Sequence, residues 1–345
     1  MPTKECVEIF TLTNSNNITV KITNYGGIIL LLALPDKFGR IDDVTLGYEK
    51  LADYQQDTYF FGAVIGRYAN RIENAEFKLN NYTYKLAKND ENNHLHGGHQ
   101  GFNKVIWKPQ LITDNEQTKL VLRYYSKDGE ENYPGNLQVE VTYSLTEDNE
   151  LCIDYSAVTD QDTIVNLTNH AYFNLAGHKQ NNILNHQLKI YANYFTPINK
   201  EFIPTGEIYS VKNTSMDFRT LTTINSKLNN TDPQLVYGQG FDHNWVLNLD
   251  GQGKSLKKAA ELYEPNSGRF MEVFTTKPGI QFYSGNFLKG PIKGKDNAVY
   301  YQHSGLCLET QYFPNSPNYN HFPSPVLKAN EKYHHTTIYK FSVKN

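Results

Sequence analysis

The sequence is poor in three features that would place a protein in a special class: cysteines, long apolar runs and charge of one sign. Its 345 residues hold only Cys6, Cys152 and Cys307, so a full disulfide framework is excluded and reduced thiols are expected. The N-terminal segment has no apolar core and no cleavage site, so no signal peptide is expected. These observations predict a cytoplasmic protein.

The longest apolar stretch, "GGIILLLALP" at 26–35, is too short to cross a bilayer. It predicts a strand buried on both faces. The formal net charge is only −3, and no run of lysine or arginine occurs. Binding to nucleic acid or to a membrane surface is therefore not expected.

Alternation of apolar and polar residues is what the sequence has in abundance, and it predicts strands. Hairpins are expected at 136–158, at 77–86 around Asn80 and Asn81, and at 260–276, with a further strand at 119–126 and one short helix within 48–57. Many short strands without a repeat or linker favour an all-β, mostly antiparallel sandwich or barrel, with residues 1–345 as one domain.

The stretch "NNHLHGGHQGF" (92–102) places three histidines close together. His94 and His96 would share one side of a strand, and His99 could turn back toward them, so a metal site is one interpretation. Such a site would still need a carboxylate or a further histidine from elsewhere in the fold. Gly97 and Gly98 would let the chain turn sharply after His96.

Other polar residues stand in apolar surroundings, and each has an ordinary structural interpretation. Arg67 or Arg71 could form a buried ion pair, His170 could be a core histidine, Asp242 could cap a turn, and Gln281 could be a buried amide. Glu309 is the exception. It follows the apolar run "GLCL", and a carboxylate there is costly to bury unless it is paired or used.

Four motifs occur in a fixed order: LHGG (95–98), NHAYFNL (169–175), GFDHNW (240–245) and LETQ (308–311). Together they resemble the galactose mutarotase (aldose 1-epimerase) family over most of the chain. The resemblance implies a β-supersandwich with an open cleft. It also implies an enzyme that interconverts the α and β anomers of free hexoses, typically galactose and glucose, with no metal or other cofactor and a small-molecule sugar as its partner.

By residue-by-residue match, the resemblance implies the following site. Glu309 is similar to the family's catalytic base, His170 to its catalytic acid and His96 to its second active-site histidine, while Asn70, Arg71, Asp242 and Gln281 match its substrate-binding positions. The roles of His94, His99 and Arg67 stay open, with a structural part expected for both histidines. A monomer or a homodimer is expected.

The chemistry explains these residue types. Opening an aldose ring takes a proton from the C1 hydroxyl and gives one to the ring oxygen, so one base and one acid must exchange roles. We expect Glu309 to be ionised and His170 protonated when sugar is bound, with Glu309 raising the pKa of His170. His96 is expected to bond a sugar oxygen and to add a positive field. Tyr68, Trp107 and Phe282 could stack on a sugar, although most aromatic residues must be core.

Three alternatives remain open at this point. The chain could be a non-catalytic sugar-binding or regulatory protein on the same fold, a metal-dependent enzyme, or an epimerase of phosphorylated hexoses. The last of these would need extra cations at the cleft.

Overall fold

Most of the strands predicted from alternation belong to one nine-stranded sheet, and the predicted hairpin at 77–86 stands apart as a two-stranded sheet. The structure, a computed structural model, describes residues 6–114, 117–180, 182–248 and 255–344; part of the N-terminal segment interpreted above lies outside them. From one edge to the other the strands are β10 (Lys108–Asp114), β11 (Gln117–Ser126), β12 (Leu137–Leu145), β13 (Glu150–Thr159), β28 (Lys332–Val343), β22 (Arg269–Thr275), β21 (Lys257–Tyr263), β16 (Gln187–Ile190) and β19 (Thr222–Thr223). The predicted pairs β12–β13 and β21–β22 are confirmed, as is the strand at 119–126.

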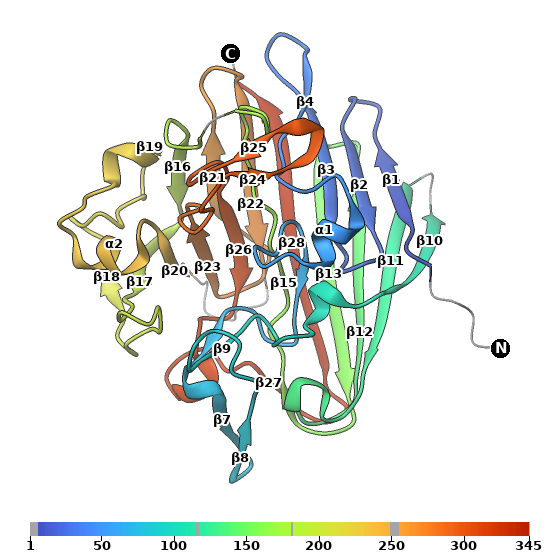
Figure 1. Cartoon of the computed structure of the whole chain (residues 1–345), viewed down its shortest axis with the longest axis vertical. Coiled ribbons are helices and arrows are strands. Elements are labelled where there is room, and N and C mark those ends of the chain that lie inside the picture. The colour runs from blue at the N-terminus through green and yellow to red at the C-terminus, as the bar shows by residue number, and fades with distance from the viewer. Residues whose placement is uncertain (1–5, 115–116, 181, 249–254, 345) are drawn as a thin grey trace.

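Two smaller sheets lie against one face of this sheet (Figure 1). One contains β1 (Ile9–Thr13), β2 (Thr19–Thr23), β3 (Ile29–Pro35) and β4 (Ile41–Asp43); the other contains β18 (Tyr209–Ser210), β17 (Ala192–Thr196), β20 (Asp242–Leu247), β23 (Gly279–Tyr283) and β26 (Cys307–Gln311). Leu32, Val141 and Phe282, one from each sheet, belong to the same buried cluster. Each such side chain contributes about 1.5–3 kcal/mol on burial, so this shared core holds the layers together.

The fold class predicted from the sequence, a large and mostly antiparallel β-sandwich, is confirmed. Every pair of named strands in the described part of the chain is antiparallel. The remaining named elements are β5 (Val64–Ile65), β6 (Arg71–Ile72), β7 (Glu76–Leu79), β8 (Tyr82–Lys85), β9 (His94–Leu95), β14 (Thr163–Ile164), β15 (Thr168–Asn169), β24 (Ile292–Lys293), β25 (Val299–Tyr300), β27 (Val326–Leu327), α1 (Leu51–Gln55) and α2 (Pro233–Gly238). None of the helices described is long and apolar enough to span a bilayer.

Two local predictions can be compared with the structure in detail. The hairpin β7–β8 turns at Asn80 and Asn81, both with positive φ, as the tolerance of asparagine for that region predicts. The prediction for 26–35 was wrong in part. Leu32 faces the core, whereas Leu30 and Leu31 are half-buried. The pairing with β2 shifts register at Leu30, which packs on a smaller cluster.

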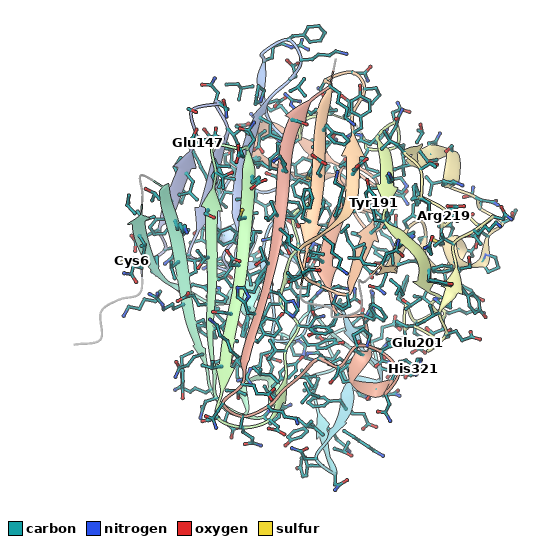
Figure 2. All side chains as sticks on the ribbon, turned by 180° about the vertical axis from the view of Figure 1, so that it is seen from behind. Cys6, Glu147, Tyr191, Glu201, Arg219 and His321 are labelled. Carbon is teal, nitrogen blue, oxygen red and sulfur yellow. The ribbon has the colours of Figure 1, made fainter. Side chains whose placement is uncertain are left out.

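The other face of the nine-stranded sheet is the outer surface of the molecule (Figure 2). Its strands place ion pairs there, such as Arg123 with Glu140 at 2.7 Å and Lys340 with Glu150 at 2.9 Å. These partly exposed pairs contribute little to stability, but they keep this side of the sheet polar. The predicted site residues therefore lie elsewhere, on the smaller five-stranded sheet and the loops around it.

Candidate active site

Three neighbouring strands, β20, β23 and β26, present polar side chains on one face. Gln281 pairs directly with Glu309 across β23 and β26, and Asp242, the first residue of β20, pairs with Tyr283 of β23. Because side chains alternate along a strand, the intervening Phe282 and Leu308 point into the core. Pairing thus brings together carboxylates that are 67 positions apart in the sequence (309 minus 242).

Two loop residues in the left-handed conformation face these strands. Asn70 has a φ of 69° and His96 a φ of 52°. Asn70 immediately precedes β6 and His96 immediately follows β9, the two strands of one short pair. The main-chain N–H of His96 donates to the Asn70 carbonyl, and the Asn70 N–H donates to His96 Nδ1, both at 3.2 Å. A side chain on Gly97 would meet the Gly66 carbonyl at 1.8 Å, so the sharp turn predicted after His96 requires glycine.

His170 follows β15, which pairs with β5, and its N–H donates to the Ala63 carbonyl at 2.9 Å. Its Nε2 lies 3.7 Å from Glu309 Oε1. The His170 ring lies 5.2 Å from the His96 ring, centroid to centroid. The imidazole–carboxylate pair is almost completely buried, since its side chains are 6% and 3% exposed.

These residues line one small cleft of about 110 Å³. Its lining consists of Thr58, Tyr59, Phe60, Asn70, Arg71, Leu95, His96, His170, Tyr172, Asp242, Tyr283, Phe287 and Glu309. Of the predicted site residues, only Gln281 is missing from this lining. Gln281 donates instead from Nε2 to Asp242 Oδ1 at 2.7 Å, which places it behind that carboxylate.

Two buried oxygen atoms, one in the cleft and one behind its wall, have no hydrogen-bond partner in the described part of the protein. Within the described residues, neither Glu309 Oε2 nor Gln281 Oε1 has a hydrogen-bond partner, although both atoms are buried. An unpaired buried oxygen typically costs about 1–3 kcal/mol. Of the two residues only Glu309 lines the cleft, so its Oε2 suits a polar ligand that can donate to it.

Arg71 carries the positive charge of the cleft. Its Nε donates to Asp90 Oδ2 at 2.8 Å, and its Nη1 lies 3.6 Å from Asp242 Oδ2. Burial alone would lower the pKa of Arg71, but the two carboxylates outweigh it and raise that pKa. Burial raises the pKa of Asp242 despite the opposing effect of Arg71.

The pKa values of the central pair differ from the sequence-based expectation. Burial lowers the pKa of His170 to about 4. Burial, together with the charge of Asp242, raises the pKa of Glu309 well above its usual range, against the effect of Arg71. The net pKa of His170 is therefore lowered, and the upward effect predicted for Glu309 does not offset burial.

His96 is a neutral donor rather than a source of positive field. Burial and the charges of His170 and Arg71 lower its pKa well below the usual value. The expectation that His96 adds a positive field is thereby corrected. Because Nδ1 accepts from the Asn70 N–H, the neutral ring carries its hydrogen on Nε2.

The three-histidine metal site considered from the sequence does not assemble. His94 contacts the Ala87 carbonyl through Nδ1 and the Tyr133 hydroxyl through Nε2, each at 2.7 Å, and His99 is exposed. Instead, His96, His170 and Glu309 offer ligand atoms within 4.8 Å of one another. A metal at His96 would need a lone pair on Nε2, but the Asn70 N–H favours the tautomer with hydrogen there.

The aromatic residues of the cleft were missed by sequence reasoning. Tyr68, Trp107 and Phe282 are fully buried core residues. Phe60 lines the cleft instead, with its ring 4.7 Å from the His96 ring. Phe202 lies 4.8 Å from the Arg71 guanidinium.

Both phenylalanines have a φ of 61°, which is rare for bulky residues and typical of functional sites. Left-handed phenylalanines have no signature in a single sequence. Only the loop conformation reveals them.

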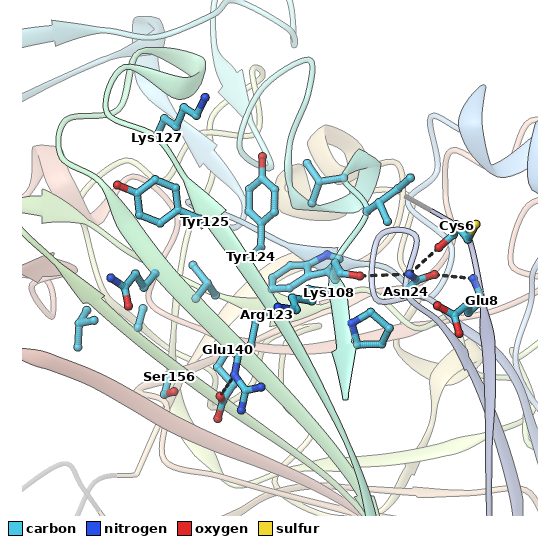
Figure 3. A pocket seen from close by; sticks show the side chains of 18 of the residues that line it. Cys6, Glu8, Asn24, Lys108, Arg123, Tyr124, Tyr125, Lys127, Glu140 and Ser156 are labelled. Atoms are coloured by element: carbon cyan, nitrogen blue, oxygen red, sulfur yellow. Dashed lines mark hydrogen bonds and ion pairs between the residues drawn. The ribbon is translucent and has the colours of Figure 1, made fainter. Parts of the chain in front are cut away.

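A larger hollow of about 1250 Å³ lies on another part of the molecule, between the N-terminal segment and the strands β10 to β13 (Figure 3). Asn24 ties its rim together: the amide donates to the carbonyls of Cys6 and Trp107 and accepts the N–H of Glu8. Arg123 pairs with Glu140 there, partly exposed to solvent. The hollow lacks the buried acid–base pair of the cleft, so size does not identify the site.

Comparisons with known proteins point to one family. The sequence profile of the family described as Aldose 1-epimerase matches residues 8–340. The chain is 46% identical to the galactose mutarotase of Sus scrofa over 337 residues, covering 98% of this chain and 94% of the relative. It is 37% identical to the aldose 1-epimerase of Escherichia coli (strain K12), covering 99% and 96%.

Solved structures give the same result. An aldose epimerase homologue from C. elegans superposes with a TM-score of 0.89 at 26% identity, covering 99% of this chain and 100% of that one. The galactose 1-epimerase of Lactobacillus acidophilus NCFM superposes with a TM-score of 0.85 at 28% identity, with the same coverage. Fold and relatives define an enzyme of the isomerase class on a galactose mutarotase-like sandwich. The chain belongs to the aldose 1-epimerase family.

Proposed function

We propose that this enzyme interconverts the α and β anomers of free aldohexoses, galactose and glucose foremost, by acid–base catalysis without a cofactor. The observation that carries the proposal is the buried pair of His170 and Glu309, 3.7 Å apart, with Glu309 Oε2 unpaired in a polar cleft. A carboxylate and an imidazole at this distance suit transfer of two protons to and from one small substrate.

Ring opening uses both members of the pair. Glu309 accepts the proton of the C1 hydroxyl, the O1–C1 bond becomes a carbonyl, the C1–O5 bond breaks with its electrons going to O5, and His170 Nε2 gives its proton to O5. Rotation about the C1–C2 bond and the reverse transfers close the ring on the other face of C1. Atoms and charge balance at each step.

The pair holds one proton in both of its working states. Before opening it is carboxylate and imidazolium; after opening it is carboxylic acid and neutral imidazole. The pKa directions of this cleft favour the second state. They lower the energy of the open-chain intermediate, because that step removes two buried charges.

The surrounding groups hold the sugar while C1 turns. Arg71 offers a rigid fork of donors, and Asp242 accepts from hydroxyls. Asn70 joins them in the cleft lining, while Gln281 acts through the hydrogen bond that orients Asp242. His96 presents Nε2–H, a fixed donor for a sugar oxygen on which negative charge develops.

The charge of the cleft favours unphosphorylated sugars. Among the described residues that line it, Arg71 is the only Lys or Arg, and Asp242 and Asp90 already face it. A phosphate group would have to compete with these carboxylates for one guanidinium. This disfavours the alternative of an epimerase for phosphorylated hexoses.

The test is polarimetry of freshly dissolved α-D-galactose, α-D-glucose and glucose 6-phosphate, with and without enzyme. Accelerated decay is expected for the two free sugars and little for the phosphate ester; an unchanged decay for both free sugars would refute the proposal. The non-catalytic alternative is tested by E309Q, which should still bind galactose in calorimetry but lose turnover. Treatment with a chelator should leave the rate unchanged.

Three further properties belong to the same proposal. Residues 1–345 act as one domain, supported by a core cluster that draws on residues from Leu12 to Phe341. The enzyme works as a monomer or a homodimer. It works in the cytoplasm, supported by the free thiols of Cys152 and Cys307.

A further inference from the structure

Two residues of one strand, β26, lie beside the two nitrogens of the His170 ring. Cys307 and Glu309 lie two residues apart on β26, so their side chains share a face. Cys307 Sγ lies 3.5 Å from Nδ1, and Glu309 Oε1 lies 3.7 Å from Nε2. The imidazole is thus placed edge-on between a thiol and a carboxyl, and both of these are buried.

The proposed function fixes which ring nitrogen carries hydrogen. Because Nε2 must take up and release a proton, the neutral His170 ring keeps its hydrogen on Nδ1. Nδ1 is then the donor, and the thiol sulfur 3.5 Å from it is a weak acceptor. The neutral ring then has its lone pair on Nε2, directed toward Glu309.

His96 has the opposite arrangement, because its Nδ1 accepts the Asn70 N–H. The two imidazoles, 5.2 Å apart, are therefore not interchangeable. One presents a fixed N–H to the cleft, and the other presents a nitrogen that can take up and release a proton.

We propose that Cys307 is a positioning residue for catalysis: its sulfur holds His170 in the Nδ1–H form, with Nε2 aimed at Glu309 and at the ring oxygen of the sugar. The proposal rests on the proposed function. Cys307 itself exchanges no proton, since Nδ1 keeps its hydrogen throughout the cycle. Burial raises the pKa of its thiol well above the usual value, so the sulfur stays neutral.

The test compares C307A and C307S with wild type, and C152A serves as the matched control. Cys152 is a half-buried thiol on β13, remote from the cleft lining. Loss of one weak hydrogen bond predicts a fall in kcat of about twofold to tenfold in C307A with KM unchanged. C307S, which keeps a polar acceptor, should recover most of the rate, and C152A should match wild type.

The pH profile separates positioning from simple packing. The acid limb, where His170 gains a proton beside an already protonated Glu309, should move to lower pH in C307A, because Nδ1–H has lost an acceptor. The titratable groups around the His170 ring are Glu309, Cys307, His96, Tyr172 and Tyr283. None of the others is altered by the substitution. A wild-type kcat and acid limb in C307A would overturn the proposal.

Nitrogen-15 NMR of histidine-labelled protein gives a readout that does not depend on turnover. The His170 signals, identified by their loss in H170N, should show hydrogen on Nδ1 in wild type and a mixture of tautomers in C307A. A wild-type signal with hydrogen on Nε2 overturns the proposal even if C307A fails to fold. If the wild-type enzyme leaves the decay of galactose unchanged, the proposed function fails, while the spectra still decide the tautomer.

Discussion

Two arginine–histidine sites, built from residues only a few positions apart, have opposite characters. The first, which we call the closed site, consists of Arg67 and His94. Its Arg67 donates to Ser126 Oγ and to the carbonyls of Ser126, Lys127 and Pro134 at 2.8–2.9 Å. His94 has protein partners on both ring nitrogens, and Tyr133 contacts both residues.

The second, the cleft site, has the same two residue types in Arg71 and His96. Beside them, Glu309 Oε2 and Gln281 Oε1 are buried without a hydrogen-bond partner among the described residues. Burial alone does not separate the two sites, since all four residues are buried. Hydrogen-bond satisfaction does separate them. A site that the protein completes for itself is structural, and one that it leaves incomplete is open to a ligand.

The largest expected effect is on the cleft. E309Q removes the base but keeps the shape of the side chain, so kcat should fall by about 10²–10⁴-fold. Stability should not fall, because a buried carboxyl is replaced by a neutral amide. Polarimetry and urea unfolding check both statements, with E140Q on the outer sheet as the control. An E309Q enzyme that turns over at the wild-type rate would break the comparison.

The closed site should respond in stability instead. R67M leaves the carbonyls of Ser126, Lys127 and Pro134 without their donor, so the free energy of unfolding should fall by about 2–4 kcal/mol. The kcat of the folded fraction should stay within about twofold, because the cleft is untouched. Urea unfolding measures the free energy of unfolding. Polarimetry, with the rate divided by the concentration of folded enzyme, measures kcat. Loss of turnover without loss of stability would contradict the structural assignment of Arg67.

The two histidines offer a matched pair. H96N suits the left-handed backbone but lacks the Nε2–H donor, so kcat should fall by about tenfold with stability nearly unchanged. H94N leaves the Tyr133 hydroxyl and the Ala87 carbonyl poorly paired, so stability should fall by about 1–2 kcal/mol with kcat unchanged. Measuring both properties on both variants tests the contrast, and equal profiles for the two variants would refute it.

The smallest effect concerns pH. Burial lowers the pKa of His94 to about 4, whereas an unfolded chain binds that proton near pH 6.5. The stabilising contribution of neutral His94 is therefore fully present above about pH 6.5 and is lost as the pH falls toward 4. In the cleft, kcat should fall as the pH drops through about 4, because His170 then gains a proton; this fall is the acid limb of the pH profile. H94N should flatten the stability curve between pH 6.5 and 4 without moving that limb; a shifted limb would mean that the sites are coupled.

Much of this molecule could be predicted from its sequence, because alternation and motif order are local. The hairpin β12–β13 was predicted correctly, and six of the seven predicted site residues line one cleft. What the sequence could not predict depends on three-dimensional surroundings: which nitrogen of a histidine carries hydrogen, how burial shifts the pKa of Glu309, and the position of Gln281 behind Asp242. The left-handed Phe60 was also missed, since nothing in its sequence neighbourhood marks its conformation.

Asp242, Gln281 and Glu309 lie on one face of three paired strands. Catalytic activity therefore depends on the correct register of these strands. A slip of one residue in the pairing of β26 would turn Glu309 into the apolar core and bring Thr310 to the cleft. No intermediate register gives a partly assembled site. A refolded sample of this enzyme should therefore consist of fully active and inactive molecules, and its specific activity should count the correctly registered chains.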